Sequence, residues 1–353
     1  MSQLNGKVRV RVENLEKRFP ISKGLFRKAT DFVHAVDGIS FDINAGESLG
    51  LVGESGCGKT TTGRMLVKLE DSTSGTILIR DGNTDELADV TQIHDRADQK
   101  EFRKNVQMIF QDPYESMNPR RTIFDVVAEP LAVQGIGTTE EREERVVALL
   151  RMVGLTPPEP FLFRYPHELS GGQRQRVAIA RALVMEPSFV VADEPTSMLD
   201  VSIRISIMRL MLELAERLGV TYLYITHDLA VARYMCDRIA VMYLGKIVEM
   251  ARTEELLTNP MHPYTRALLS AVPVPDPQYR RPPVEIEGGI ARAVNPSAEC
   301  RFLARCPFST DVCRTAPHPQ LDDRGGEHYV ACYLVAPDGT WTGADRAVLN
   351  LRS

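Results

Sequence analysis

A glycine-rich turn between an apolar segment and a helical segment constrains this chain more than any other feature. The turn reads Gly53-Glu-Ser-Gly-Cys-Gly-Lys-Thr60 and fits the spacing G-x-x-x-x-G-K-[ST]. Glycines let backbone N–H groups converge on phosphate oxygens, and the helix N-terminus attracts an anion. We therefore expect a nucleotide-phosphate cradle rather than a chance glycine-rich turn. The residues expected to bind the nucleotide here are Gly53, Glu54, Ser55, Gly56, Cys57, Gly58, Lys59, Thr60 and Thr61.

Apolar segments alternate with helical patterns along the first 255 residues, which favours an α/β core with a largely parallel sheet. The expected strands are Ser48–Val52, Val106–Phe110, Phe189–Ala192, Thr221–Ile225 and Arg238–Tyr243. The expected helices include Lys59–Leu69, Glu141–Val153, Gly171–Met185 and Ser202–Leu218. Alternating Val8, Val10 and Val12 predict an antiparallel flank. Residues from about 112 to 187 show helical patterns and no convincing strand, so we expect an inserted helical subdomain.

The composition of the sequence changes after about residue 255. Seven prolines crowd into a short span, which is typical of an extended linker: Pro260, Pro263, Pro273, Pro275, Pro277, Pro282 and Pro283. The sequence thus predicts two units, an ATPase-like domain over 1–255 and an extension over 256–353. Four of the six cysteines of the chain fall in this extension.

Two acids end an apolar strand pattern well after the glycine-rich turn, at Asp193 and Glu194. In a nucleotide hydrolase Lys59 would reach the β- and γ-phosphates, while Thr60 and Asp193 would hold Mg²⁺. Glu194 would then polarise the attacking water as a general base. Alone, such a pair could be surface acids at a strand end, but its place after the turn favours hydrolysis. The sequence has no N-K-x-D element to select guanine, so ATP is favoured over GTP.

A second glycine-rich helix start, Leu169-Ser-Gly-Gly-Gln-Arg-Gln-Arg176, resembles the signature motif of the ATP-binding-cassette (ABC) ATPases. A simple helix cap is the alternative reading. A serine hydroxyl and free N–H groups at a helix N-terminus can bind an anion. The resemblance implies that this end completes the nucleotide site of a second cassette subunit, a copy or a paralogue. The residues it assigns to nucleotide binding are Ser170, Gly171, Gly172 and Gln173.

Further residues match the family in its order. Gln111 resembles the glutamine that senses Mg²⁺ and water and links to the membrane subunit, so it is a third expected Mg²⁺ ligand beside Thr60 and Asp193. Asp200 belongs to the loop expected at the dimer seam and is also expected to bind nucleotide. His227 resembles the histidine that contacts the γ-phosphate. With Glu194, these make Gln111 and His227 the expected catalytic residues. Phe19 is the expected adenine-stacking residue, with Phe26 or a purely structural role for Phe19 as alternatives.

The composition of the chain narrows the possible protein classes. Forty-two basic residues against forty-seven acidic ones give a net charge of −5, which weighs against a nucleic-acid binder. No apolar run is long enough to cross a bilayer, so any membrane role should be peripheral. The family resemblance implies a place on the cytoplasmic face of the inner membrane. A soluble cassette of regulation or repair is the rival from another class.

The segments Gln111–Arg120 and Asn259–Leu269 are similar to the oligopeptide/dipeptide importer family. This resemblance implies two transmembrane permease subunits and an external substrate-binding protein as partners. It leaves nickel or an oligosaccharide open as cargo.

Cys300, Cys306, Cys313 and Cys332 supply four thiols in a chain expected to be cytoplasmic, where disulfides are disfavoured. Four cysteines can hold a [4Fe–4S] cluster or one zinc ion. Zinc sites usually pair cysteines as C-x₂-C, and these spacings are wider. The family resemblance also implies [4Fe–4S], with Zn²⁺ and free structural thiols as alternatives.

Overall fold

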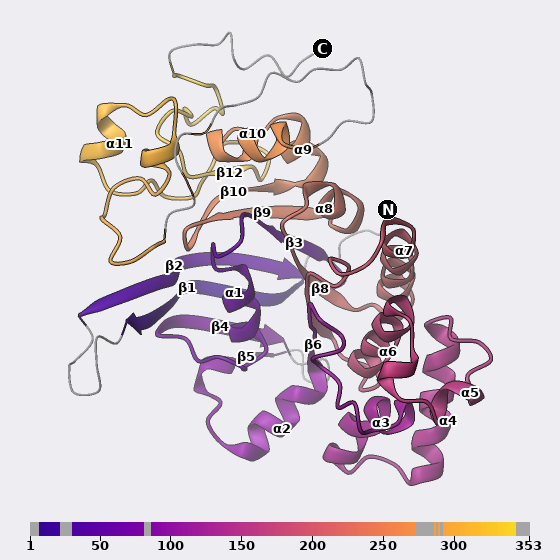
Figure 1. The fold of residues 1–353 in the computed structure, drawn as a ribbon. Helices are drawn as coiled ribbons and strands as arrows, with labels where there is room; N and C mark the ends of the chain where they lie inside the picture. Colours follow the sequence, from indigo (N-terminus) through magenta and orange to yellow (C-terminus); the bar gives the residue numbers. More distant parts are fainter. Residues whose placement is uncertain are drawn as a thin grey trace.

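A computed structural model describes residues 7–21, 30–80, 86–272, 286, 289 and 292–343. Within these residues, the central sheet has the strand order β11-β12-β10-β9-β3-β8-β7-β6 (Figure 1). Its middle strands run parallel: β6 (Val106–Ile109), β7 (Phe189–Asp193), β8 (Thr221–Thr226), β3 (Ser48–Val52) and β9 (Arg238–Tyr243). β10 (Lys246–Arg252) pairs antiparallel with β9. The expected α/β core with a parallel sheet is confirmed.

The second sheet is the antiparallel flank expected from the N-terminal valines. It contains β2 (Asp31–Asn44), β1 (Val8–Ile21), β4 (Ser74–Arg80) and β5 (Leu87–Asp89), in that order. Val10 and Val12 are buried in a cluster shared with β3 and α1 (Lys59–Leu66), while Arg11 between them pairs with Asp42 of β2. The alternation therefore has the physical cause proposed for it, one buried and one solvated face.

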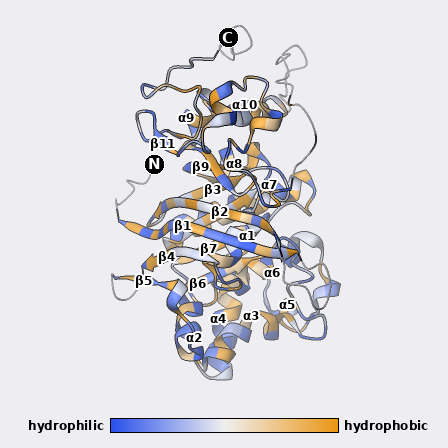
Figure 2. Ribbon diagram, turned by 90° about the vertical axis from the view of Figure 1, so that its left-hand side faces the viewer, coloured by the Kyte–Doolittle hydropathy of each residue, from blue (hydrophilic) through white to orange (hydrophobic). Residues whose placement is uncertain are grey.

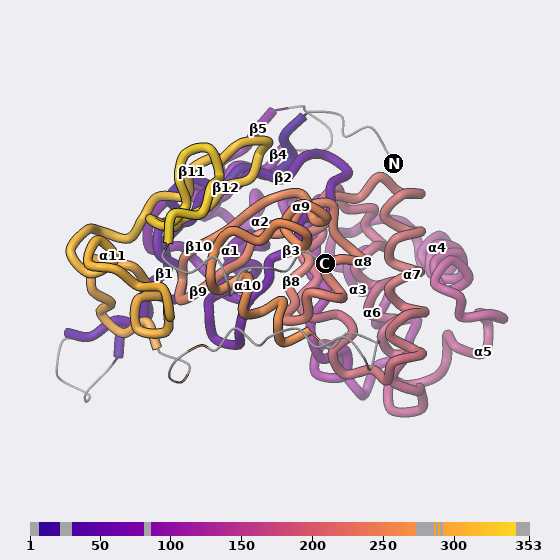
Figure 3. Tube along the Cα trace, turned by 90° about the horizontal axis from the view of Figure 1, so that it is seen from above, coloured from indigo at the N-terminus to yellow at the C-terminus, as the bar shows by residue number. Residues whose placement is uncertain are grey.

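Helices cover the parallel sheet on both sides. Their bounds are α1 Lys59–Leu66, α2 Arg96–Asn105, α3 Ile123–Gln134, α4 Thr139–Met152, α5 Glu159–Leu162, α6 Gly171–Leu183, α7 Val201–Leu218, α8 Leu229–Met235, α9 Thr253–Thr258, α10 Pro263–Ser270 and α11 Asp311–Thr315. The described residues also form three short 3₁₀ helices: η1 Val90–Gln92, η2 Pro166–Glu168 and η3 Leu303–Arg305. Seen from above, α4 to α7 lie on the side opposite α11, β11 and β12 (Figure 3).

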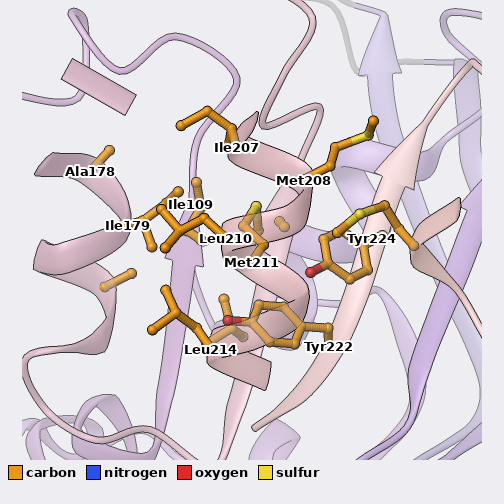
Figure 4. Close-up of a cluster of buried hydrophobic side chains, with 14 of the residues drawn as sticks. Ile109, Ala178, Ile179, Ile207, Met208, Leu210, Met211, Leu214, Tyr222 and Tyr224 are labelled. Carbon is orange, nitrogen blue, oxygen red and sulfur yellow. The ribbon is translucent and has the colours of Figure 1, made fainter. Parts of the chain in front are cut away.

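Two buried clusters follow from the alternation of side chains along the sheet. On β8, Tyr222 and Tyr224 face the cluster shared with α6 and α7, whereas Leu223 and Ile225 face the cluster shared with α1 and the flank. Figure 4 shows the first cluster, in which α7 lays Met211 and Leu214 over the two tyrosines. Both colours of the hydropathy scale occur on most elements, as expected for helices and strands with one buried face (Figure 2).

The C-terminal residues extend the central sheet. β12 (Tyr329–Val330) pairs with β10, and β11 (Asp322–Asp323) pairs with β12. Glu249 of β10 is fully buried and accepts backbone N–H groups from Met261 (2.7 Å) and His262 (3.0 Å). The ring of His328, also buried, lies 2.7 Å from the same carboxylate. One buried carboxylate thus joins two parts of the tail, residues 261–262 and residue 328, to the core.

Residues 112–187 contain helices and no strand in the part of the chain that the structure describes, as expected. The division at residue 255 stays a prediction, and the strands β11 and β12 were not foreseen. No described helix has both the length and the apolar character that a membrane crossing requires.

Candidate functional site

The predicted phosphate loop lies between the end of β3 and the start of α1. Two of its glycines are required by close approach of other backbone: a Cβ on Gly53 would lie 2.1 Å from the Met242 carbonyl oxygen, and one on Gly58 would lie 2.0 Å from that of Ala35. Gly58 also has φ +112°, a conformation that side chains other than glycine rarely adopt. The loop is thereby seated between β9 and β2. Ser55 and Gly56 are exposed at its crest.

Lys59 is buried within this loop, and its ammonium donates to the carbonyl oxygens of Gly53 (2.7 Å) and Glu54 (2.9 Å). Cys57 lies buried beside it, and burial raises the pKa of that thiol. Thr60 and Thr61 form the first turn of α1, whose N-terminus carries no side-chain cap. The first N–H groups of α1 therefore remain available for an external anion.

Two of the expected Mg²⁺ ligands, Thr60 and Asp193, lie together. The hydroxyl of Thr60 donates to Asp193 at the end of β7, and the two oxygens lie 3.2 Å apart. Burial raises the pKa of Asp193, and the hydrogen bond from Thr60 acts in the opposite direction. A hydroxyl and a carboxylate fit Mg²⁺, which prefers oxygen ligands and keeps several waters.

Three predicted catalytic residues from different segments meet at the edge of the sheet. One carboxylate oxygen of Glu194 accepts from the amide of Gln111 at 3.2 Å, and the other lies 2.9 Å from Nδ1 of His227. Glu194 has φ +43°, uncommon for a residue with a side chain. Its backbone N–H donates to the Ile225 carbonyl, which holds that conformation. Glu194 directly follows Asp193, so the proposed base and the proposed metal ligands share one strand end.

The signature turn has a different environment. Ser170 is exposed and caps α6, since its hydroxyl accepts from the N–H of Gln173 (3.3 Å) and the Gln173 side chain accepts from the N–H of Ser170 (3.0 Å). A Cβ on Gly172 would lie 2.6 Å from Ile203 of α7, so the turn packs against the helix that Asp200 caps. Across the described ranges, no hydrogen bond joins this turn to the phosphate loop.

Phe19 lies in β1 opposite Val33, half-buried, with the Lys17 ammonium 4.9 Å from its ring centroid. The alternative residue, Phe26, lies outside the described residues.

The four tail cysteines are free thiols. The N–H of Cys300 donates to the Cys313 carbonyl, and a cavity of about 460 Å³ is lined by Cys300 and Cys306. Among the residues with described placement, no three His, Cys, Asp or Glu side chains are grouped to hold a metal ion. The predicted [4Fe–4S] and zinc assignments are therefore not confirmed.

Sequence reasoning missed two residues that contact the phosphate loop. Arg305 pairs with Glu54, and the hydroxyl of Tyr264 accepts the Glu54 N–H at 2.9 Å. Tyr264 falls within the segment that carries the importer resemblance, but nothing local links it to a loop more than 200 residues earlier. Arg305 has no sequence signal of its own.

Comparison with known proteins agrees with this geometry. Residues 36–197 match the family model described as "ABC transporter", and residues 248–313 match "Oligopeptide/dipeptide transporter, C-terminal region". The oligopeptide transport ATP-binding protein AppF of Bacillus subtilis is 44% identical over 95% of this chain and 100% of its own length. The dipeptide transport ATP-binding protein DppF of Haemophilus influenzae is 42% identical over 91% of this chain and 95% of its own length.

Among solved structures, the dimeric cassette MJ0796 bound to ADP and Pi superposes with a TM-score of 0.60 at 31% identity. The match covers 69% of this chain and 98% of that one. The structure of cbiO1 from Clostridium perfringens gives 0.58 at 29% identity, over 71% of this chain and 90% of that one. The chain is therefore an ABC-type ATPase and belongs to the ATP-binding proteins of the oligopeptide/dipeptide ABC-transporter family.

Proposed function

We propose that the chain powers peptide import by closing with a second cassette around ATP and reopening after hydrolysis. The observation that carries this proposal is the arrangement of the two glycine-rich helix ends. The loop before α1 leaves its N–H groups open beside Glu194, while the signature turn before α6 makes no hydrogen bond to that loop within the described residues. A site that needs both ends is completed only by a second subunit.

The surface next to the signature turn supports such a partner. Met198 and Val201, which flank Asp200, are 65% and 71% exposed. Exposed apolar side chains grouped beside a functional loop are typical of an interaction surface. MJ0796, which shares the fold, is described as dimeric in its ADP- and Pi-bound state. The partner is a second copy of this chain or a related cassette.

The described residues divide the reaction among themselves. Lys59 and the open N–H groups of α1 bind the phosphates, and Phe19 stacks on adenine. Thr60, Asp193 and Gln111 would hold Mg²⁺, which would supply positive charge beside the phosphates. Glu194 takes the proton of the attacking water, while Gln111 and His227 orient its carboxylate through the contacts described above.

The relatives support a proposal for the cargo and the assembly. Relatives at 42–50% identity carry names of oligopeptide, dipeptide or peptide import ATP-binding proteins, and the match to the importer C-terminal model supports the same class here. We therefore place the chain at the cytoplasmic face of the membrane, with two permease subunits and an external binding protein. Recovery of multi-helix permease subunits from detergent-solubilised membranes supports this assembly, whereas recovery of nucleic acid or ribosomes contradicts it.

For the tail we propose a [4Fe–4S] cluster held by Cys300, Cys306, Cys313 and Cys332. Its support is the donor chemistry and the presence of four free thiols between residues 300 and 332. A four-iron cluster spaces its cysteines more widely than one ion does, so it suits thiols that do not converge on a point. Iron and acid-labile sulfide in anaerobically purified protein test the proposal, and zinc without iron would contradict it.

The substitution Glu194→Gln tests the ATPase assignment. The amide keeps the shape of the side chain but cannot take a proton, so turnover should fall by at least ~100-fold with ATP binding retained. Glu186→Gln is a matched control, because Glu186 is an exposed glutamate that also has a positive φ. Full turnover in the Glu194 variant would refute this residue as the base.

A further inference from the structure

The phosphate loop is held from outside the ATPase core by the C-terminal extension. The guanidinium of Arg305 donates two hydrogen bonds to the carboxylate of Glu54, at 2.7 and 3.0 Å. The hydroxyl of Tyr264, which is fully buried, accepts the backbone N–H of the same residue. Glu54 is the first residue after Gly53, so both its side chain and its backbone are fixed by residues more than 200 positions away.

The extension is itself anchored firmly at this point. Phe302, three residues before Arg305, is buried against the rings of Tyr243 and Tyr264, with centroids 5.2 and 5.5 Å away. Tyr243 ends β9, and its ring also lies 5.8 Å from the Arg305 guanidinium carbon. The side chain of Arg305 is only 9% exposed. The donor is therefore preorganised, with little side-chain entropy left to lose on pairing.

The charge of Glu54 gives this contact a consequence for binding. Glu54 is the one acidic residue in a loop that receives a polyanion. An unpaired carboxylate in that place repels phosphate, and a rotated one competes for the ammonium of Lys59, which already donates to the Glu54 carbonyl. A bidentate guanidinium neutralises the carboxylate and fixes its direction.

We propose that Arg305 is a positioning residue of the ATPase reaction: it holds the Glu54 carboxylate neutralised and outside the phosphate cradle, and thereby sets the affinity for nucleotide. The extension thus tunes the ATPase through one ion pair. This inference rests on the proposed role of Gly53–Thr60 as the phosphate cradle.

The test measures the Kd of a non-hydrolysable ATP analogue with Mg²⁺ by titration calorimetry on the full chain. Arg305→Gln should raise the Kd roughly tenfold, and Arg305→Lys, which restores charge but not the paired geometry, about threefold. The double variant Glu54→Gln/Arg305→Gln should return to within about threefold of the original chain, because no carboxylate remains to repel phosphate.

Arg301→Gln is the matched control. Arg301 lies four residues earlier, is 8% exposed, and pairs with Asp37 of β2 instead of with the loop. It should lower the thermal midpoint as Arg305→Gln does, yet leave the Kd within about twofold, since the loop keeps its ion pair. Equal weakening by both arginine variants, or a double variant as weak as Arg305→Gln, would show a merely structural role and overturn the inference. An unchanged Kd in Arg305→Gln overturns it too.

Lys59→Ala distinguishes failure of this inference from failure of the phosphate-cradle assignment. If Lys59→Ala abolishes binding while the Arg305 variants change nothing, the cradle stands and the positioning role fails. If Lys59→Ala binds as well as the original chain, the cradle assignment itself is wrong.

Discussion

The helices α1 and α6 both begin in a glycine-rich turn, yet only at α6 do the first backbone N–H groups have a side-chain partner. At α1 the N-cap is Gly58, with no side chain to satisfy those groups, and the surrounding loop is braced by β2, β9 and the extension. At α6, Ser170 and Gln173 satisfy each other in a capping box on an exposed surface. The first end is open to an anion in the lone chain, whereas the second is satisfied without one. In the proposed dimer, the second end would meet an anion bound to the other subunit.

The largest expected effect comes from removing the cation of the braced end. Lys59→Ala should reduce nucleotide binding by more than ~100-fold, because a buried, desolvated charge contact to phosphate is lost. Equilibrium binding of a non-hydrolysable ATP analogue checks this. Lys68→Ala is the control: Lys68 is also nearly buried but pairs with Asp71 beyond the helix, and its loss should leave binding unchanged.

A smaller effect is expected at the self-capped end. Ser170→Ala should lower the free energy of unfolding by ~1 kcal/mol through loss of the cap. It should also lower ATP turnover by ~10-fold, with nucleotide binding by the dilute chain unchanged. Denaturant titration, steady-state ATPase assays and calorimetry measure the three quantities.

Thr138→Ala provides the comparison, since Thr138 caps α4 with a capping box of the same kind. It should cost the same stability and leave turnover intact. If both variants lose turnover equally, the difference between the two helix ends has no functional meaning.

The last expected effect is on stability alone and concerns the anchoring of the extension on β2. Burial disfavours ionisation of Asp37, but Lys246, Arg301 and His34 outweigh it and lower its pKa to about 2. A carboxyl with a lowered pKa in the folded chain stabilises it above the unfolded value near 4, and this stabilisation is lost as the pH falls towards 2. Asp37→Asn should therefore cost about 2 kcal/mol at neutral pH, and the difference should shrink between pH 4 and 2.

Unfolding by denaturant across this pH range provides the measurement. Asp42→Asn, which breaks the partly exposed pair with Arg11, should cost no more than about 0.5 kcal/mol. A cost for Asp37→Asn that stays constant down to pH 2 would show that its charge does not anchor the extension.

The sequence predicts this molecule well where local pattern and structure have the same cause. The strands Ser48–Val52 and Arg238–Tyr243 were predicted to the residue, because fully buried parallel strands read as short apolar runs between turns. The predicted helix Lys59–Leu69 ends earlier, at Leu66, since the backbone turns at Lys68, which has φ +54°. Gln111, Glu194 and His227 were named from the motifs, and the structure brings all three together.

The rest depends on contacts that leave no local trace. β11 and β12 are two residues each, too short to show an alternation, and they form only because β10 offers a free edge. The pair of Arg305 with Glu54 joins positions 251 residues apart. Arginine and glutamate are common on protein surfaces, so the residue types give no sign of this contact. Only the three-dimensional arrangement reveals it.

Glu249 makes the extension hard to lose. The hydrogen-bond partners described for its buried carboxylate are residues 261, 262 and 328. All three lie beyond the strand that carries Glu249. A chain cut after residue 255 would keep the charge and lose all three donors, a penalty of ~3–5 kcal/mol in a protein of ordinary stability. Proteolysis of the tail would thus yield an unstable fragment instead of an unrestrained ATPase that burns ATP without its transporter.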